Sequence, residues 1–243
     1  MSVSIGGPSI TERLAAAREA VAQACRDANR DPATVRIVAV SKRKPVQAVL
    51  EAMAAGQTEF AENYLQEGEQ KIAAVAAVAA VAAASSDSPC WHFVGHLQSG
   101  KAAPVARCFE VIQGLDSSRA AAKLARIGRD RSVPVRVFLQ ICLAEGGDRA
   151  GVAPQDAARF LDAIVDPAGL VVEGVMAVAP ADGDPRPHFA RLRECAKILR
   201  ALGLPGAPVT EISAGMSGDF VEAIREGATI VRLGSAIFGP RLS

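Results

Sequence analysis

The chain has 243 residues, of which 50% are hydrophobic and 22% are charged, and its formal net charge at pH 7 is +1. This length allows one large domain or two small ones, and the near balance of charge, without acidic or basic blocks, gives no support for a nucleic-acid or membrane-surface partner. The five cysteines are odd in number and include no Cys-x-x-Cys pair, so we expect reduced thiols in a cytoplasmic protein rather than a disulfide framework or a zinc site.

The first predicted element is a helix. Residues 1–10 contain no basic residue followed by an apolar run, and we therefore expect no signal peptide. Ser9 and Glu12 match a capping box, and apolar residues then recur at helical spacing as far as about Asn29. The longest apolar tract, residues 72–84, is too short and too weakly hydrophobic to span a bilayer.

Eight strands alternating with helices follow this N-terminal helix. The strands are expected at residues 35–40, 58–61, 91–94, 111–113, 135–143, 171–176, 209–213 and 229–233. The helices after them are expected at 45–55, from 65 into the alanine-rich tract, and at 102–107, 117–127, 154–165, 188–202 and 218–226. Continuous apolar runs are typical of strands covered on both faces, as in parallel sheets. The pattern predicts a single (β/α)8 barrel domain spanning residues 1–243, with the N-terminal helix as an addition.

The alternative fold is an open, doubly wound sheet. No Gly-x-Gly-x-x-Gly follows the first strand, so dinucleotide binding has no local support in the sequence.

Functional side chains of such a barrel lie at the carboxyl ends of the strands. Lys42 directly follows the first strand, where a lysine beside a low-dielectric pocket can lose its proton and attack a carbonyl to form a Schiff base. Taken alone, the run Lys42, Arg43 and Lys44 also fits a solvated basic loop. The functional interpretation is favoured by what stands at the other strand ends, namely Asn63, His96 with Gln98, Asp116, Met176, Ser213 to Ser217, and Arg232 to Ser235.

Two of these strand ends predict a phosphate site. Gly215, Met216 and Ser217 lie in a loop of small residues that leads into a short helix, where backbone N–H groups favour an anion. Gly234 and Ser235 follow the eighth strand, and barrels commonly hold phosphate in these two loops. A lysine together with a phosphate site predicts pyridoxal 5′-phosphate (PLP), whose aldehyde condenses with lysine. A phosphorylated sugar bound by a Schiff-base aldolase fits the same pattern.

Arg232 is expected beside the cofactor ring. Arginine is a recognised partner of the pyridine nitrogen of PLP, and its permanent charge disfavours protonation of that nitrogen. An unprotonated ring is a poorer electron sink, which argues against demanding carbanion chemistry such as transamination. A structural ion pair is the alternative role for Arg232, and Met176 fits either a ring-covering residue or a core methionine.

The three histidines predict no metal site. His92 and His96 are four residues apart, but they lie on a strand and the loop after it, and the segment supplies no third ligand. We expect His92 to be packed inside the protein and His188 to lie at the surface in a proline-rich loop.

Six blocks of the sequence resemble the pyridoxal phosphate homeostasis protein family. They are residues 38–45 (VAVSKRKP), 62–67 (ENYLQE), 91–99 (WHFVGHLQS), 174–177 (GVMA), 215–219 (GMSGD) and 231–239 (VRLGSAIFG), and the likeness extends from about Val35 to Gly239. The resemblance implies the barrel of the alanine racemase N-terminal domain and a protein that binds PLP without established catalytic turnover. It also implies storage or delivery of the cofactor, with PLP and PLP-dependent apo-enzymes as partners.

The resemblance assigns roles to individual residues. Lys42 is the implied Schiff-base lysine, and Arg232 lies against the ring nitrogen. The residues implied to hold the phosphate or line the site are Ser217, Gly234, Ser235, Ser213, Gly215, Met216, Asn63 and Met176. No catalytic residue is implied, and we expect a monomer.

Two departures from the family pattern affect contacts around the site or a partner surface. Gly100 stands where the family usually has Asn, and Arg149-Ala150-Gly151 stands where it has Lys-Ser-Gly. The alternative function is that of a PLP-dependent enzyme with weak racemase activity. Racemases of this fold need a tyrosine from a second domain of the partner subunit, whereas the one tyrosine here, Tyr64, lies early in the barrel. We therefore expect no appreciable racemase activity.

Overall fold

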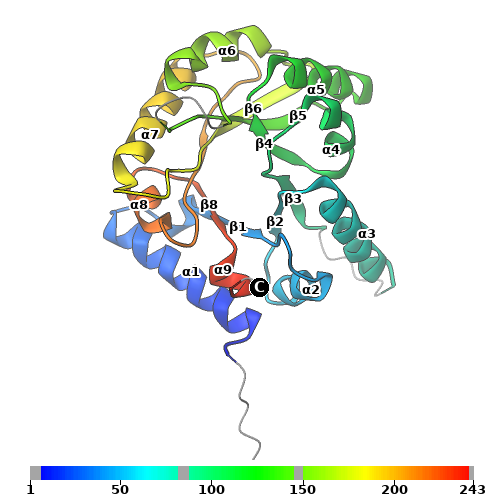
Figure 1. Ribbon diagram of the computed structural model, residues 1–243, viewed down its shortest axis with the longest axis vertical. Helices are drawn as coiled ribbons and strands as arrows, with labels where there is room; N and C mark the ends of the chain where they lie inside the picture. The colour runs from blue at the N-terminus through cyan, green and yellow to red at the C-terminus, as the bar shows by residue number, and fades with distance from the viewer. Residues whose placement is uncertain (1–6, 82–87, 145–149, 241–243) are drawn as a thin grey trace, which may run out of the picture.

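Eight parallel strands form a closed barrel in the computed structural model, which describes residues 7–81, 88–144 and 150–240 (Figure 1). Each strand pairs with the next one in sequence, and β8 pairs with β1. The strands are β1 (Arg36–Val40), β2 (Glu59–Glu62), β3 (Cys90–Phe93), β4 (Val111–Leu115), β5 (Val135–Gln140), β6 (Leu170–Met176), β7 (Glu211–Ser213) and β8 (Ile230–Leu233). The predicted (β/α)8 fold is confirmed, and the open-sheet alternative is wrong.

Helices surround the barrel. They are α1 (Ile10–Asp27), α2 (Val46–Ala54), α3 (Leu65–Val81), α4 (Ala102–Cys108), α5 (Ser118–Arg131), α6 (Ala157–Ile164), α7 (Arg186–Ala201), α8 (Phe220–Arg225) and α9 (Ser235–Phe238). The additional helix α1 begins with the predicted capping box between Ser9 and Glu12 and lies against α2, α8 and α9 (Figure 1). Arg30 fixes the end of α1 to α8, because its guanidinium donates to the carbonyls of Ile224 and Ala228 at 2.7 and 2.8 Å.

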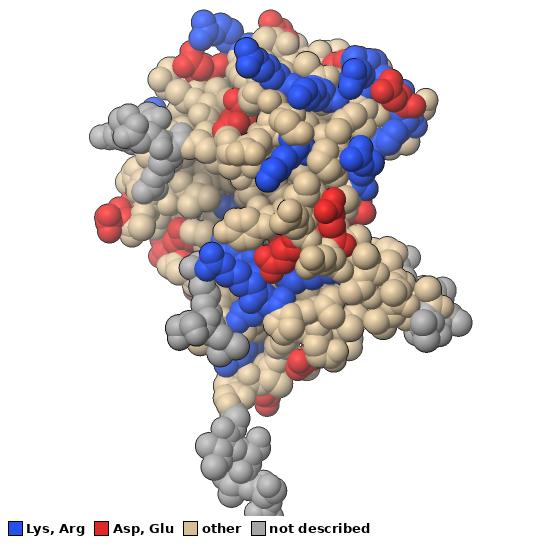
Figure 2. Space-filling view, turned by 45° about the vertical axis from the view of Figure 1, so that its right-hand side comes forward, with Lys and Arg blue, Asp and Glu red and all other residues tan. Residues whose placement is uncertain are grey.

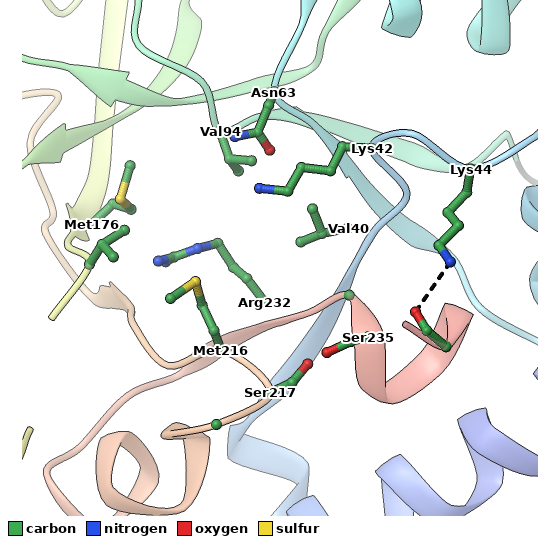
Figure 3. Close-up of a pocket in the computed structure, with 14 residues that line it drawn as sticks. Val40, Lys42, Lys44, Asn63, Val94, Met176, Met216, Ser217, Arg232 and Ser235 are labelled. Atoms are coloured by element: carbon green, nitrogen blue, oxygen red, sulfur yellow. Dashed lines mark hydrogen bonds between the residues drawn. The ribbon is translucent and has the colours of Figure 1, made fainter. Parts of the chain in front are cut away.

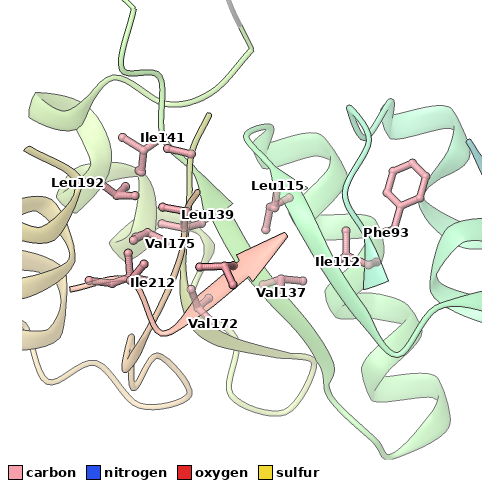
Figure 4. Close-up of a cluster of buried hydrophobic side chains, with 14 of the residues drawn as sticks. Phe93, Ile112, Leu115, Val137, Leu139, Ile141, Val172, Val175, Leu192 and Ile212 are labelled. Atoms are coloured by element: carbon pink, nitrogen blue, oxygen red, sulfur yellow. The ribbon is translucent and has the colours of Figure 1, made fainter. Parts of the chain in front are cut away.

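Alternate residues of the strands supply two separate apolar clusters. Residues that point outward pack under the helices, as Figure 4 shows for Ile112, Val137 and Leu139. Inward-pointing residues fill the barrel with a smaller cluster of Val38, Ala61, Val111, Phe138, Met176 and Ile230. The barrel is thus a packed core beneath the carboxyl ends of its strands, and any ligand must bind above it.

Several element boundaries differ from the sequence prediction. Strand β7 begins at Glu211 rather than at Val209, because Val209 has a φ of 44° and cannot continue an extended strand. Helix α7 begins at Arg186, so Pro187 and His188 lie in its first turn rather than in a loop, and proline is well tolerated there. The four-residue helix α9 was not predicted, since it is too short to show a periodic pattern.

The surface carries charges of both signs. Figure 2 shows basic and acidic side chains in the upper and the lower part of the view, and a largely uncharged surface along α3. Among the residues that the structure describes, no helix has the length and apolar character that a membrane span requires.

Candidate functional site

A cavity of about 450 Å³ opens at the carboxyl ends of the strands. Its volume falls within the range of about 300–1,000 Å³ that is typical of small-molecule sites. Figure 3 shows Lys42, Arg232, Ser217 and Ser235 directed toward this common space from the turn after β1, from β8, from the loop after β7 and from the start of α9. The described residues that line the cavity are Val40, Lys42, Lys44, Asn63, Val94, Met176, Val178, Met216, Ser217, Gly218, Arg232, Gly234, Ser235 and Gly239.

The turn that carries Lys42 is held by hydrogen bonds on both sides of that residue. Ser41 Oγ donates to Glu62 Oε1 at 2.7 Å, and Lys71 Nζ donates to the Ser41 carbonyl at 2.6 Å. Arg43 has a φ of 60°, an uncommon conformation for a residue with a side chain, and its N–H donates to Glu67 Oε1 at 2.5 Å. These bonds fix the backbone before and after Lys42, and the lysine side chain therefore extends into the cavity from a rigid base (Figure 3).

A buried ion-pair cluster supplies these bonds. Lys71 Nζ lies 2.7 Å from Glu62 Oε1 and 2.7 Å from Glu67 Oε1, and the Glu62 side chain has no exposed surface. Burial raises the pKa of Glu62, although hydrogen bonds from Lys71 and Ser41 oppose the shift. Glu62 Oε2 has no hydrogen-bond partner among the described residues. The sequence did not predict this cluster, because no pattern distinguishes Lys71 from other lysines on predicted helices.

Arg232 is fixed below the cavity by oxygens that carry no full charge. Its Nη1 donates to the Ser213 carbonyl and to Ser213 Oγ, both at 2.8 Å, and its Nη2 donates to the Ala177 carbonyl at 2.9 Å. Burial lowers the pKa of Arg232 to about 10. The guanidinium is therefore still protonated at neutral pH, and the structure provides a fixed cation on the floor of the site.

The loops after β7 and β8 meet at one end of the cavity. The Ala236 N–H donates to Ser217 Oγ at 3.2 Å, which joins the two loops, and Ser217 and Ser235 lie close together in Figure 3. The Met216 N–H donates to Asp219 Oδ1 at 2.6 Å, which shapes the turn before α8.

Lys44 supports the same end of the cavity. Its Nζ donates to the carbonyls of Phe238, Gly239 and Pro240 at 2.9, 3.2 and 2.8 Å. Lys44 is thus a cap for the carboxyl end of α9 as well as a lining residue, and not part of a solvated loop.

Eight of the ten residues predicted to bind the cofactor line the cavity: Lys42, Asn63, Met176, Met216, Ser217, Arg232, Gly234 and Ser235. The other two do not. Ser213 is fully buried beneath the cavity and contacts Arg232 and Gln113. Gly215 has a φ of 90°, and its carbonyl accepts the Arg232 N–H at 2.9 Å, so it shapes the loop rather than lining the site.

Asn63 and Met176 differ in their surroundings. Asn63 Oδ1 is buried and has no hydrogen-bond partner within the described part of the chain, although the residue lines the cavity. Met176 both lines the cavity and belongs to the interior cluster, so its two proposed roles are compatible. Buried polar atoms are nearly always satisfied in native proteins, and Asn63 therefore marks a place where a ligand group is expected.

The other predicted polar residues lie outside the cavity lining. His96 Nδ1 is 3.7 Å from Asp116 Oδ2, and the His96 side chain is 57% exposed. Tyr64 is 51% exposed. His92 is buried, as predicted, whereas His188 is half-buried in α7. Within the described ranges, no group of three or more potential metal ligands occurs.

Two residues of the departures from the family pattern, Gly100 and Ala150, are not among the described residues that line the cavity. Gly100 is exposed in a short 3-10 helix (Ser99–Lys101). Arg149 lies outside the described residues, whereas Gly151 has a φ of 129°, so a side chain there would strain the backbone.

Comparisons with known proteins agree with this architecture. A family model described as "Alanine racemase, N-terminal domain" matches residues 13–241. The "Pyridoxal phosphate homeostasis protein" of Pseudomonas aeruginosa is 39% identical over 237 residues, which cover 96% of each chain. The protein of the same name from Haemophilus influenzae is 34% identical over 236 residues, again covering 96% of each chain.

A solved structure extends the comparison. PipY of Synechococcus elongatus, solved with PLP bound, superposes with a TM-score of 0.79 at 32% identity, covering 95% of this chain and 100% of PipY. The chain belongs to the pyridoxal phosphate homeostasis protein family.

Proposed function

We propose that this protein binds PLP in the cavity and stores or delivers it, with Lys42 Nζ joined to the cofactor aldehyde through an imine bond. The proposal is supported by the names of its relatives and by the PLP bound to PipY. Three features of the site support it further. They are a lysine on a hydrogen-bonded turn, two loops of small residues after β7 and β8, and an arginine fixed on the floor of the cavity.

The residues present fit each part of PLP. Ser217 and Ser235, with the backbone of Gly234, offer hydroxyl and main-chain groups for the phosphate. Arg232 would lie against the ring nitrogen and, remaining protonated, would keep that nitrogen unprotonated. Asn63 Oδ1, which lacks a protein partner in the described structure, would accept a hydrogen bond from the cofactor or its linkage. When bound, PLP supplies an aldehyde that condenses with amines and a ring that withdraws electrons.

The exposure of the cavity to solvent favours storage and delivery of the cofactor over catalysis. Met216 and Val178 line the cavity yet are 41% and 44% exposed, so the cofactor would remain accessible from solvent. We propose PLP-dependent apo-enzymes as recipients, a monomer as the working form, and a reducing compartment such as the cytoplasm, which fits the free cysteines.

The observation that carries the proposal is the position of Lys42. Its side chain enters the cavity opposite the serine loops, from a turn that Glu62, Glu67 and Lys71 hold in place. A lysine so placed reaches an aldehyde whose phosphate is held at the far end of the same cavity.

The test is reduction of the PLP-loaded protein with borohydride, followed by peptide mass spectrometry. We expect a phosphopyridoxyl group on Lys42, and loss of the visible absorbance of bound cofactor in Lys42→Ala. Lys197→Ala is the matched control, since the Lys197 side chain is 77% exposed on α7, and it should bind PLP like the parent protein. An unmodified Lys42 in a protein that shows no cofactor absorbance would overturn the proposal.

A further inference from the structure

Five polar side chains cross the packed interior of the barrel in an unbroken line. They are Glu59 on β2, His92 on β3, Gln113 on β4, Ser213 on β7 and Arg232 on β8. His92, Gln113, Ser213 and Arg232 are at most 4% exposed. Burying so many polar groups beside the apolar cluster inside the barrel is unfavourable unless each group is bonded, so the line calls for a specific role.

Each neighbouring pair in the line is within hydrogen-bond distance. Arg232 Nη1 is 2.8 Å from Ser213 Oγ, and Ser213 Oγ is 2.7 Å from Gln113 Oε1. Gln113 Nε2 is 2.8 Å from His92 Nδ1, and His92 Nε2 is 3.2 Å from Glu59 Oε2. The line therefore joins the floor of the cavity to the opposite end of the barrel.

The chemistry of the groups favours one direction for each bond. Arginine has no acceptor, so Ser213 Oγ accepts from Arg232, and the Ser213 hydroxyl donates its own hydrogen bond to Gln113 Oε1. The Gln113 amide then donates to His92 Nδ1, which leaves the imidazole proton on Nε2, facing the Glu59 carboxylate. The opposite amide orientation would require Nδ1 to carry the proton and would set a bare Nε2 3.2 Å from the Glu59 carboxylate, with the weak S–H donor of Cys90 at 3.6 Å to offset the repulsion.

The far end of the line is anchored. Arg36 Nη1 donates to both oxygens of Glu59 at 3.0 Å, and Arg36 Nη2 lies 3.3 Å from Glu211 Oε2. Glu59 is therefore held as a carboxylate, and the pKa of Glu59 is lowered by its bonds to His92 and Arg36 against the effect of burial. A fixed acceptor at one end orients each donor in turn up to Arg232.

We infer that His92, Gln113 and Ser213 are positioning residues that aim the Arg232 guanidinium at the ring nitrogen of the cofactor. The inference rests on the proposed PLP site. Gln113 Oε1 accepts the hydrogen bond of the Ser213 hydroxyl, and this turns a lone pair of Ser213 Oγ toward Arg232. The arginine is thereby fixed before the ligand binds, and preorganisation of this kind strengthens binding because little side-chain freedom remains to be lost.

The test compares PLP with a carbocyclic analogue in which C–H replaces the ring nitrogen. Only PLP can use a correctly aimed Arg232, whereas both ligands present the same aldehyde and phosphate. We expect Gln113→Met and, independently, Ser213→Ala to weaken PLP binding by about tenfold and binding of the analogue by less than about twofold. Affinities are measured by equilibrium dialysis, on variants whose urea unfolding shows that they are folded.

Gln57→Met is the matched control. Gln57 is also a buried glutamine, but its amide donates to the backbone carbonyls of Ile37 and Glu59 and bonds to none of the five side chains of the line. We expect it to leave the ratio of the two affinities unchanged. An equal loss for both ligands in Gln113→Met and Ser213→Ala, or no loss for either, would overturn the positioning role while leaving PLP binding intact. A parent protein that binds neither ligand would overturn the proposed function and this inference together.

A second readout needs no ligand. The chain has three histidines, so the imidazole ¹⁵N signals of a histidine-labelled sample can be assigned with His96→Gln and His188→Gln. We expect His92 to be neutral with its proton on Nε2, and Gln113→Met to change that signal but not the other two. A His92 protonated on Nδ1 alone would contradict the direction of the line.

Discussion

Glu62 and Lys71 form a buried ion pair beside the turn that carries Lys42. Removing the cation leaves a carboxylate in the protein interior, because the Glu62 side chain has no exposed surface and that of Lys71 is 7% exposed. We expect Lys71→Met to lower the free energy of unfolding by about 3–5 kcal/mol, measured by urea denaturation. Lys123→Met, which removes an exposed lysine bonded to the Ser99 carbonyl, should change it by less than about 0.5 kcal/mol. Equal effects of the two substitutions would show that the pair is not buried as described.

The same carboxylate predicts a pH dependence. Burial raises the pKa of Glu62 in the folded protein above its usual value of 4.5, so the folded state holds this proton more tightly than the unfolded chain. Stability therefore falls as pH rises from about 4.5 through the raised pKa, and is constant above it. We expect the parent protein to lose stability relative to Glu62→Gln over this interval in urea titrations. A difference that stays constant with pH, or that has the opposite sign, would contradict the raised pKa.

The residues of the cavity that could be predicted from the sequence are those at or just after the carboxyl end of a strand. Lys42 and Arg232 stand at the ends of apolar strands, and parallel strands bring these ends together whatever the details of packing. Lys71 and Gln113 could not be found in this way. Their roles depend on partners in other elements, such as Glu62 and Ser213, and a single sequence contains no sign of such pairings.

The loop between β7 and α8 depends on the backbone of Gly215. Its φ is 90°, and a Cβ there would lie 2.7 Å from Ala223 Cβ and 2.8 Å from Phe220 Cα. We expect Gly215→Ala to lower the free energy of unfolding by about 1–3 kcal/mol and to weaken the binding of PLP more than that of pyridoxal, which lacks the phosphate. Gly218→Ala in the same loop is the control, since a Cβ at that position would meet no heavy atom within 4 Å. Similar stability losses in both variants would show that the fold of this loop does not depend on Gly215.

Element boundaries were less predictable than element types. The apolar run at 209–213 predicts five residues of strand, but Val209 adopts a left-handed conformation and β7 is shorter. The proline-rich pattern predicts a loop as far as Pro187, whereas Pro187 lies in the first turn of α7, a position with which proline is compatible. Propensity and pattern give the kind of element, and tertiary packing decides where each one ends.

At the scale of the whole molecule, barrel closure brings the first and last strands together. Val38 pairs with Arg232 and Ala39 with Leu233 across the β1–β8 seam, so Lys42 and Arg232 reach one cavity although they are far apart in the sequence. Eight strands alternating with helices, in about the length that a (β/α)8 barrel requires, predicted this closure. The topology of the barrel therefore brings the residues of the site together, and the individual side chains then determine its chemistry.

The form of the cavity also bears on racemase activity. Interconverting the enantiomers of an amino acid requires proton transfer on both faces of Cα. Among the described lining residues, Lys42 and Lys44 are the lysines, and Lys44 donates to three carbonyls at the end of α9. Tyr64 is exposed and outside the lining. We therefore expect the PLP-loaded protein to leave L-alanine unracemised, as followed by chiral chromatography.

Incubation in D₂O separates the possible outcomes. Exchange of the alanine Cα proton with retention of configuration, absent in Lys42→Ala, would be the one-sided proton transfer that a single base permits. Racemisation well above that of free PLP would contradict the prediction and imply a second acid or base. Its loss in Tyr64→Phe or His96→Gln would then identify that group, and would mean that a residue now outside the cavity moves into it when substrate binds.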